Sequence, residues 1–110
     1  MEITFKDKKL AKLVNDDRRM FNELGKQRST LLKRRLTQLS DAETLEDVRY
    51  LAGNFHELIK NRKGQWSCDL DQPFRLVFQP QHTPIPTDKD GKYIWTEITT
   101  VEIIEIVDYH

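Results

Sequence analysis

The stretch "WSCDLDQPFRLVF" (residues 66–78) decides the fold, because it holds two runs in which apolar and polar residues alternate. The apolar members are Trp66, Cys68 and Leu70 in the first run and Phe74, Leu76 and Phe78 in the second. Alternation with a period of two is the pattern of a β-strand with one buried face. Because the link "DLDQPF" is short and rich in turn residues, the stretch predicts an antiparallel hairpin.

Upstream of the hairpin, apolar residues recur at the three- and four-residue steps of amphipathic helices. The first helix is predicted over residues 7–24, with Gly25 as its stop. A second helix is predicted in "STLLKRRLTQLS" (residues 29–40), where Ser29 or Thr30 can cap the start. Its "LLKRRL" segment is interpreted as a leucine seam that faces the core, with arginines in solvent.

Two shorter elements complete the N-terminal half. The segment "EITFK" (residues 2–6) alternates in the manner of a strand. In "TLEDV" (residues 44–48), Thr44 and Asp47 have the spacing of a capping box, which predicts one further helical turn.

Downstream of the hairpin, prolines interrupt the segment Pro80–Lys92, which is therefore predicted to be an exposed excursion and not a central strand. Within it, the pair Asp90–Gly91 is a strong turn signal. A last long strand is predicted near residues 93–108. The order of strand, two helices and strand meander predicts an α+β fold, with helices packed on one face of a mainly antiparallel sheet.

Length and composition predict a single domain over residues 1–110. The hydrophobic fraction is 37% and the charged fraction is 33%, which is typical of a globular chain. Because the sequence lacks an apolar signal core and a bilayer-spanning stretch, we expect a cytoplasmic protein with no membrane partner. The single cysteine, Cys68, cannot form an internal disulfide and is predicted to be a buried small side chain.

The net charge is zero, but the charges are unevenly distributed. Residues 1–35 contain 11 Lys or Arg against 5 Asp or Glu, whereas residues 80–110 contain 2 against 6. A neutral total therefore still permits a basic surface that binds nucleic acid.

The chain ends on three side chains that carry or place protons, Asp108, Tyr109 and His110. In an extended strand the even-numbered residues from 104 would share one face, so that Asp108 lies beside His110, and Tyr109 would lie on the other face with Ile103. The α-carboxylate of His110 is expected to favour the protonated imidazole, which would suit a general acid. Taken alone, the tripeptide fits a solvated tail better than an active site.

A second polar group lies in "FHELIKNRKGQWS" (residues 55–67), where His56 precedes Lys60, Arg62 and Lys63. A basic turn beside a strand is a natural phosphate contact that would hold a histidine near the reacting group. The alternative is a polar approach to the hairpin with an exposed histidine.

Arg75 projects from the middle of its strand on the polar side, either as a solubilising charge at a sheet edge or as a planar donor for phosphate. The histidines have no metal-ligand spacing, and nucleotide-binding loops are absent, so neither a metal site nor a cofactor is predicted. The remaining groups suit metal-free cleavage of RNA. In that reaction a base takes the 2′-OH proton, an acid protonates the leaving 5′-oxygen, and cations offset charge on the phosphorane.

The run "FHELIKNRKGQWSCDLDQPFRLVF", followed by the terminal "DYH", resembles the HigB-type plasmid-maintenance killer toxins of the RelE superfamily. The two motifs occur in the family's order, and the strand-helix-helix start also fits. The resemblance implies a type II toxin that cleaves mRNA in the ribosomal decoding site. It also implies a cognate helix-turn-helix antitoxin that holds the toxin inactive. The toxin would contact operator DNA only through this antitoxin.

The resemblance further implies a role for each matching residue. The catalytic group is His56, Arg75, Asp108, Tyr109 and His110, and the RNA-binding group is Lys60, Arg62 and Lys63. Either Asp108 or His56 would be the base and His110 the acid, while Tyr109 would orient the substrate or stack on a nucleobase. Arg75 would stabilise the phosphate.

Two features depart from the family pattern, namely the length of the Pro80–Lys92 excursion and the neutral net charge. Both bear on how the chain engages the antitoxin and the ribosome. Two other functions stay open. One is a toxin of this fold that inhibits a protein target such as a topoisomerase, as the ParE branch is thought to do, and the other is a non-catalytic RNA- or protein-binding module. His56 and the terminal tripeptide favour the nuclease.

Overall fold

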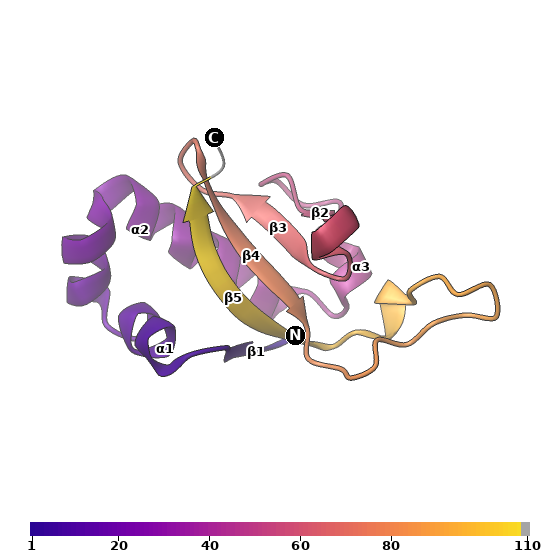
Figure 1. The fold of residues 1–110 in the computed structure, drawn as a ribbon. Coiled ribbons are helices and arrows are strands. Elements are labelled where there is room, and N and C mark those ends of the chain that lie inside the picture. Colours follow the sequence, from indigo (N-terminus) through magenta and orange to yellow (C-terminus); the bar gives the residue numbers. More distant parts are fainter. Residues whose placement is uncertain (109–110) are drawn as a thin grey trace.

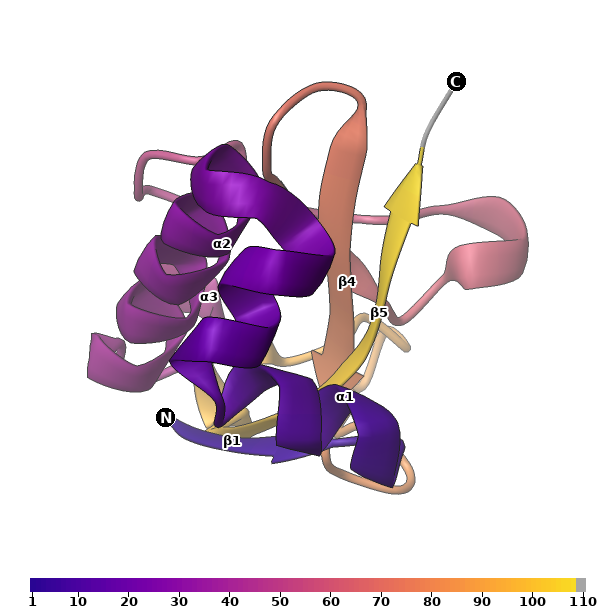
Figure 2. The ribbon, with the colours of Figure 1, turned by 90° about the vertical axis from the view of Figure 1, so that its left-hand side faces the viewer.

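The computed structural model describes residues 1–108. Its helices and strands are β1 (Glu2–Phe5), α1 (Lys8–Val14), α2 (Asp17–Asp41), α3 (Leu45–Val48), β2 (His56–Glu57), β3 (Trp66–Asp69), β4 (Phe74–Pro80) and β5 (Thr100–Asp108), with 3₁₀ turns at Lys60–Arg62 and Trp95–Glu97 (Figure 1). The helices lie together on one side of the sheet (Figure 2). The α+β prediction is confirmed.

The sheet has the strand order β1-β5-β4-β3-β2, in which β1 is parallel to β5 and the other pairs are antiparallel. The predicted hairpin is confirmed, because Trp66 pairs with Phe78 and Cys68 pairs with Leu76. These four side chains are fully buried in the core beneath the helices. Burial also raises the pKa of the Cys68 thiol, as expected for a buried small side chain.

The predicted first helix is two helices in the structure. Its leucine spacing continues across a break at Asn15 and Asp16, two residues that favour helix ends over helix interiors. Asn15 ends α1, and the Asp16 carboxylate caps α2 by accepting a hydrogen bond from the Arg19 backbone N–H at 3.1 Å. Gly25 kinks α2, because its backbone is non-helical with a φ of +83° and a ψ of 167°, so the first helical segment of α2 ends there as predicted.

After the kink α2 continues through the segment predicted as the second helix. Ser29 lies inside α2 and its hydroxyl donates to the Lys26 carbonyl at 3.1 Å, so the prediction of a cap at Ser29 or Thr30 is wrong. The capping box of α3 is confirmed, since the Thr44 backbone N–H donates to the Asp47 carboxylate at 3.1 Å.

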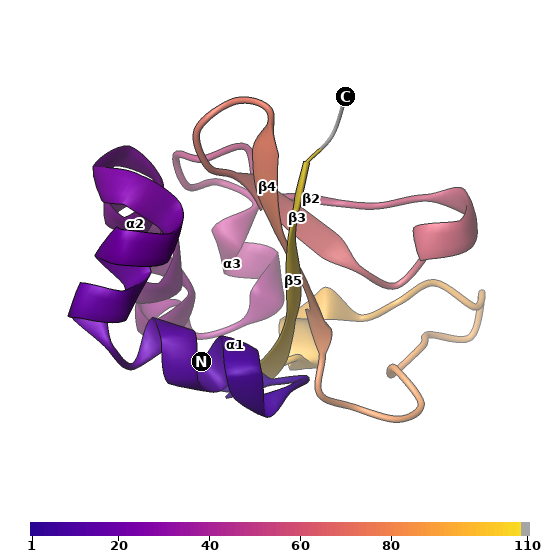
Figure 3. The same ribbon diagram turned by 60° about the vertical axis from the view of Figure 1, so that its left-hand side comes forward.

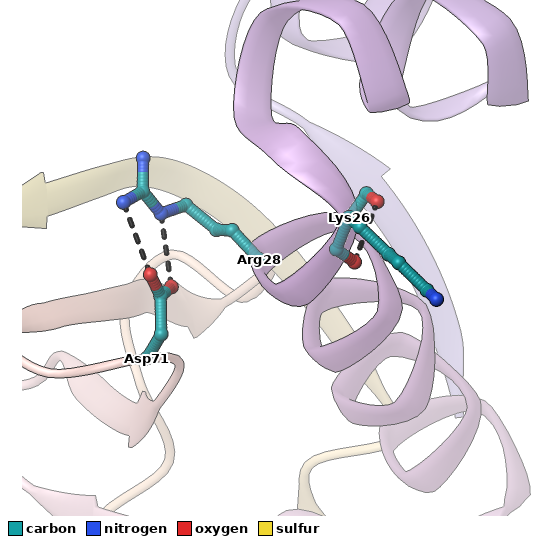
Figure 4. A network of polar contacts seen from close by, with 4 residues as sticks. Lys26, Arg28 and Asp71 are labelled. Atoms are coloured by element: carbon teal, nitrogen blue, oxygen red, sulfur yellow. Dashed lines mark hydrogen bonds and ion pairs between the residues drawn. The ribbon is translucent and has the colours of Figure 1, made fainter.

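The second half of α2 is fastened to the β3–β4 turn by Arg28. Its guanidinium donates two hydrogen bonds to the Asp71 carboxylate, at 2.9 and 3.1 Å (Figure 4). The guanidinium carbon also lies 3.4 Å from the centroid of the Phe74 ring. This forked ion pair joins the helix layer to the sheet at the end where β5 stops.

Strand β5 is shorter than predicted, because the residues before Thr100 form a 3₁₀ turn. Its alternation is also interrupted. Ile103 pairs with Phe78 and Glu105 pairs with Val77, so Ile104 is an extra residue without a partner, which is a β-bulge. Ile103 and Ile106 consequently both pack on the core, and the prediction that they lie on opposite faces is wrong.

The Pro80–Lys92 excursion is an ordered hairpin that projects from the body of the protein (Figure 1). Thr87 pairs with Tyr93, and the Gly91 backbone N–H donates to the Asp88 carbonyl at 3.0 Å, which closes the predicted turn. Residues 87–92 are exposed, as expected.

Candidate functional site

One face of the sheet is turned away from the helices (Figure 3), and the strand register places His56, Asp69 and Arg75 on it. Residues paired across neighbouring strands project to the same face, so the register defines two rows there. The first row is His56, Ser67, Val77 and Glu105, and the second is Asp69, Arg75 and Val107. We call these residues the helix-free face. The predicted catalytic residues His56 and Arg75 both lie on this face, in strands β2 and β4 on either side of β3.

His56 is held in one orientation by its own loop. Its Nδ1 atom lies 2.8 Å from the Asn54 carbonyl oxygen. Because a carbonyl oxygen only accepts hydrogen bonds, Nδ1 carries a hydrogen, and Nε2 is the ring atom of the neutral imidazole that accepts a proton. This arrangement suits His56 to the role of general base.

The loop that holds His56 is clamped by Arg35 of α2. The Arg35 guanidinium donates to the Asp69 carbonyl at 2.7 Å and to the Ala52 carbonyl at 3.4 Å. Gly53 lies against it with a φ of +116°, and a Cβ there would meet the guanidinium carbon at 2.7 Å. Arg35 is only 9% exposed, so the interpretation of the "LLKRRL" arginines as solvated is wrong for this residue.

Asp69 connects the His56 loop to Arg75. Its Oδ1 atom accepts a hydrogen bond from the Asn54 side chain at 3.5 Å and lies 3.6 Å from Arg75 Nε. The side chain of Arg75 is 30% exposed although its Nε atom is buried, so its guanidinium brings to this face a positive charge that can offset charge on a phosphate.

The three predicted RNA-binding residues do not form one group. Arg62 turns to the helix-free face, where its Nη2 atom donates to Glu105 Oε1 at 2.6 Å and its Nη1 atom donates to Gln65 at 2.9 Å. Lys60 and Lys63 instead line a cleft of about 500 Å³ between the basic turn and the excursion. The basic turn therefore presents cations to two separate surfaces.

Asp108 is the last residue of β5 and follows Val107, which pairs with Arg75. It pairs with Phe74, which packs on the core, so the register places Asp108 on the helix-covered side of the sheet. Three strand spacings, about 14 Å, separate β5 from His56 in β2. The register thus places His56 and Arg75 on the helix-free face and Asp108 on the other face, and Tyr109 and His110 lie outside the described residues.

Several residues that build the site were not singled out from the sequence: Arg35, Gly53, Asn54, Asp69 and Glu105. Glycine followed by asparagine just before a strand is a turn signal that points to the His56 loop. The contacts of Arg35 and Glu105 join segments far apart in the chain and have no local signal.

Within residues 1–108, no group of three His, Cys, Asp or Glu side chains is arranged to hold a metal ion. No helix in this range is both long and apolar enough to cross a membrane.

Residues 3–88 match the family model described as the RelE-like toxin of the type II toxin-antitoxin system HigB. The match includes His56 and Arg75 and ends inside the excursion. Among solved structures, the chain is similar to the YoeB-YefM complex from Staphylococcus aureus, with 16% identity and a TM-score of 0.58, over 100% of this chain and 97% of that one. At this identity the likeness concerns the fold. No curated protein matches the sequence.

Proposed function

This chain belongs to the HigB-like family of RelE-like type II toxins, and from this premise we propose that it inhibits translation by cleaving mRNA on the ribosome. The observation that carries the proposal is the orientation of His56, whose Nδ1–H is bound to the Asn54 carbonyl on the same sheet face as the cationic side chains Arg75 and Arg62. A base and two cations on one sheet face are what 2′-OH attack on a phosphodiester requires.

In the proposed reaction, Nε2 of His56 removes the proton from a ribose 2′-OH. The 2′-oxygen attacks the adjacent phosphorus, and the bond to the 5′-oxygen breaks. This leaves a 2′,3′-cyclic phosphate and a 5′-hydroxyl. Arg75 offsets charge on the phosphorane, while His110 protonates the leaving oxygen and Tyr109 orients the substrate. Asp108 is the alternative base, and no cofactor takes part.

The proposal extends to the partners and the location of the toxin. A cognate helix-turn-helix antitoxin holds it inactive and links it to operator DNA, and the ribosome presents the mRNA in the cytoplasm. Residues 1–110 act as one toxin domain. The family assignment supports the antitoxin partner, and the solved structure of similar fold is a complex named for YoeB and YefM.

The test is expression of the chain without an antitoxin. Growth arrest, together with transcript cleavage mapped by primer extension, is expected for the native chain. Both should be lost in His56→Ala and in a variant that ends at Tyr109, but not in the matched control His82→Ala. The variants are compared at equal protein levels by immunoblot.

Each result separates the candidate functions. Arrest that persists undiminished in both variants would exclude the nuclease. Arrest of the native chain without transcript cleavage would favour inhibition of a protein target, and the absence of both effects would favour a non-catalytic binding module.

A further inference from the structure

We propose that the cleft between the basic turn and the excursion is a second RNA-binding site, in which a nucleobase stacks on Tyr93 and lysines hold the flanking phosphates. We call it the turn–excursion cleft. Its lining includes Arg49, Lys60, Lys63, Lys92, Tyr93 and Trp95. The inference rests on the proposed function, because it takes RNA as the substrate, and it assigns a role to a segment outside the catalytic residues.

The two walls of the cleft are packed together. Gly64 in the basic turn is buried and has a φ of +96°, and a Cβ at this position would lie 3.2 Å from Ile85 Cδ1 and 3.8 Å from the Tyr93 hydroxyl. The turn and the excursion also lie on the same side of the sheet, away from the helices (Figure 3). Because the excursion is closed by the Thr87–Tyr93 pair, it presents Tyr93 at a defined position.

The cleft has uncompensated positive charge. Its two carboxylates, Glu46 and Glu57, both pair with Arg49, at 3.0 and 3.9 Å. Within residues 1–108, no carboxylate lies at ion-pair distance from Lys60, Lys63 or Lys92. Cations gathered in this way without counter-charges are the feature that binds a phosphate backbone.

The cleft also has an aromatic surface. The Tyr93 ring is supported by Trp95, with a distance of 5.0 Å between the ring centroids, and Trp95 is itself 92% buried. Lys63 Nζ lies 5.6 Å from the Tyr93 centroid, so a cation and an aromatic ring are presented together. A site with both features favours RNA over an acidic protein segment, because RNA has bases that stack on the ring as well as phosphates that contact the cations. The volume of about 500 Å³ suits one nucleotide.

The test is binding of a short, fluorescently labelled 2′-O-methyl oligoribonucleotide to the full chain, followed by fluorescence anisotropy. The methyl group blocks the attacking oxygen, so binding is measured without cleavage. We expect Tyr93→Ala to weaken binding about tenfold, as loss of one stacked base does, and Tyr93→Phe to keep the native affinity. Lys63→Ala should weaken binding and reduce its salt dependence, whereas Lys89→Ala, an excursion lysine outside the cleft lining, should leave both unchanged.

Native affinity in Tyr93→Ala overturns the proposal, as does failure of the oligonucleotide to bind the native chain. The proposal is also overturned if polyglutamate displaces the labelled oligonucleotide as well as unlabelled RNA does, and does so equally in the native chain and in Tyr93→Ala. Where Tyr93→Ala does not fold by circular dichroism, the Lys63→Ala and Lys92→Ala variants decide. Binding that depends on Tyr93, in a chain that neither arrests growth nor cleaves transcripts, would reject the proposed function and leave this site standing.

Discussion

Arg62 in the basic turn and Glu105 in β5 form an ion pair across the helix-free face, with Nη2 and Oε1 2.6 Å apart. The two residues are separated by 43 positions in the chain. Their side chains are 32% and 41% exposed, so the contact is open to solvent and to competing anions. Glu105 therefore lies beside Arg62, a cation that contacts the RNA phosphate in the proposed function.

Replacing Glu105 with Gln is therefore expected to release Arg62 for RNA. Affinity for single-stranded RNA should rise, and its dependence on salt should become steeper by about 0.7 for the added phosphate contact. The free energy of unfolding should change by less than about 1 kcal/mol, because exposed ion pairs are weak. Salt titrations of 2′-O-methyl RNA binding measure the first effect.

Glu102→Gln is the matched control for this change, since it removes the same charge from a residue that contacts Gln79 and not an arginine. An equal gain of affinity in both variants would show a general effect of net charge and contradict a specific role for Arg62.

The hairpin at residues 66–78 was predictable because every second residue is apolar and the link is short. The break at Asn15 and Asp16 was not, since the leucine spacing continues across it. The bulge at Ile104 was hidden in a segment where neighbouring residues 103 and 104 are both apolar. Local periodicity thus predicts elements well, but their interruptions depend on caps and on pairing.

The site was predictable only in part for a related reason. The polar side of the hairpin is visible in the sequence, so the face of Arg75 follows from alternation, whereas the placement of His56 on the same face depends on its pairing with Ser67. The register that sets Asp108 opposite Phe74 follows from pairing across the sheet. The burial of Arg35 depends on carbonyl groups from the distant loop at residues 52–54 and from Asp69, and no nearby residue indicates it.

Cys68 is expected to be unreactive in the folded chain. Burial raises the pKa of its thiol, so the reactive thiolate is scarce at pH 8 and the sulfur is also shielded. A disulfide reagent such as DTNB should release no colour from the native chain, and one equivalent from the chain unfolded in urea. Cys68→Ala provides the blank. Rapid reaction of the native chain would contradict the burial of this strand.

The Arg28–Asp71 pair is expected to make stability depend on acid pH. The hydrogen bonds from Arg28 lower the pKa of Asp71 below its ordinary value of about 3.9. A folded-state pKa below the unfolded one stabilises the protein above the unfolded pKa, and this contribution is lost as the pH falls through the folded pKa. Asp71→Asn should remove that part of the acid dependence and reduce stability at pH 7 by about 1.5 kcal/mol.

Urea unfolding at a series of pH values from 7 downward measures this dependence. Asp17→Asn is the matched control, because Asp17 pairs with Lys33 while 78% exposed. Equal pH profiles for the native chain and Asp71→Asn would show that the pair does not contribute to stability.

Gly53→Ala is expected to disturb both stability and the proposed catalysis. The substitution puts a side chain in the left-handed region, at about 1–2 kcal/mol, and places its Cβ 2.7 Å from the Arg35 guanidinium carbon. Gly91→Ala is the matched control, since its φ is +81° and a Cβ there meets nothing within 4 Å. Urea unfolding should therefore show a clearly larger loss of stability for Gly53→Ala than for Gly91→Ala.

Because Arg35 holds the loop that orients His56, growth arrest should also weaken in Gly53→Ala at equal protein levels and persist in Gly91→Ala. Equal losses in the two variants would show that only backbone strain matters and that the clamp on the His56 loop does not.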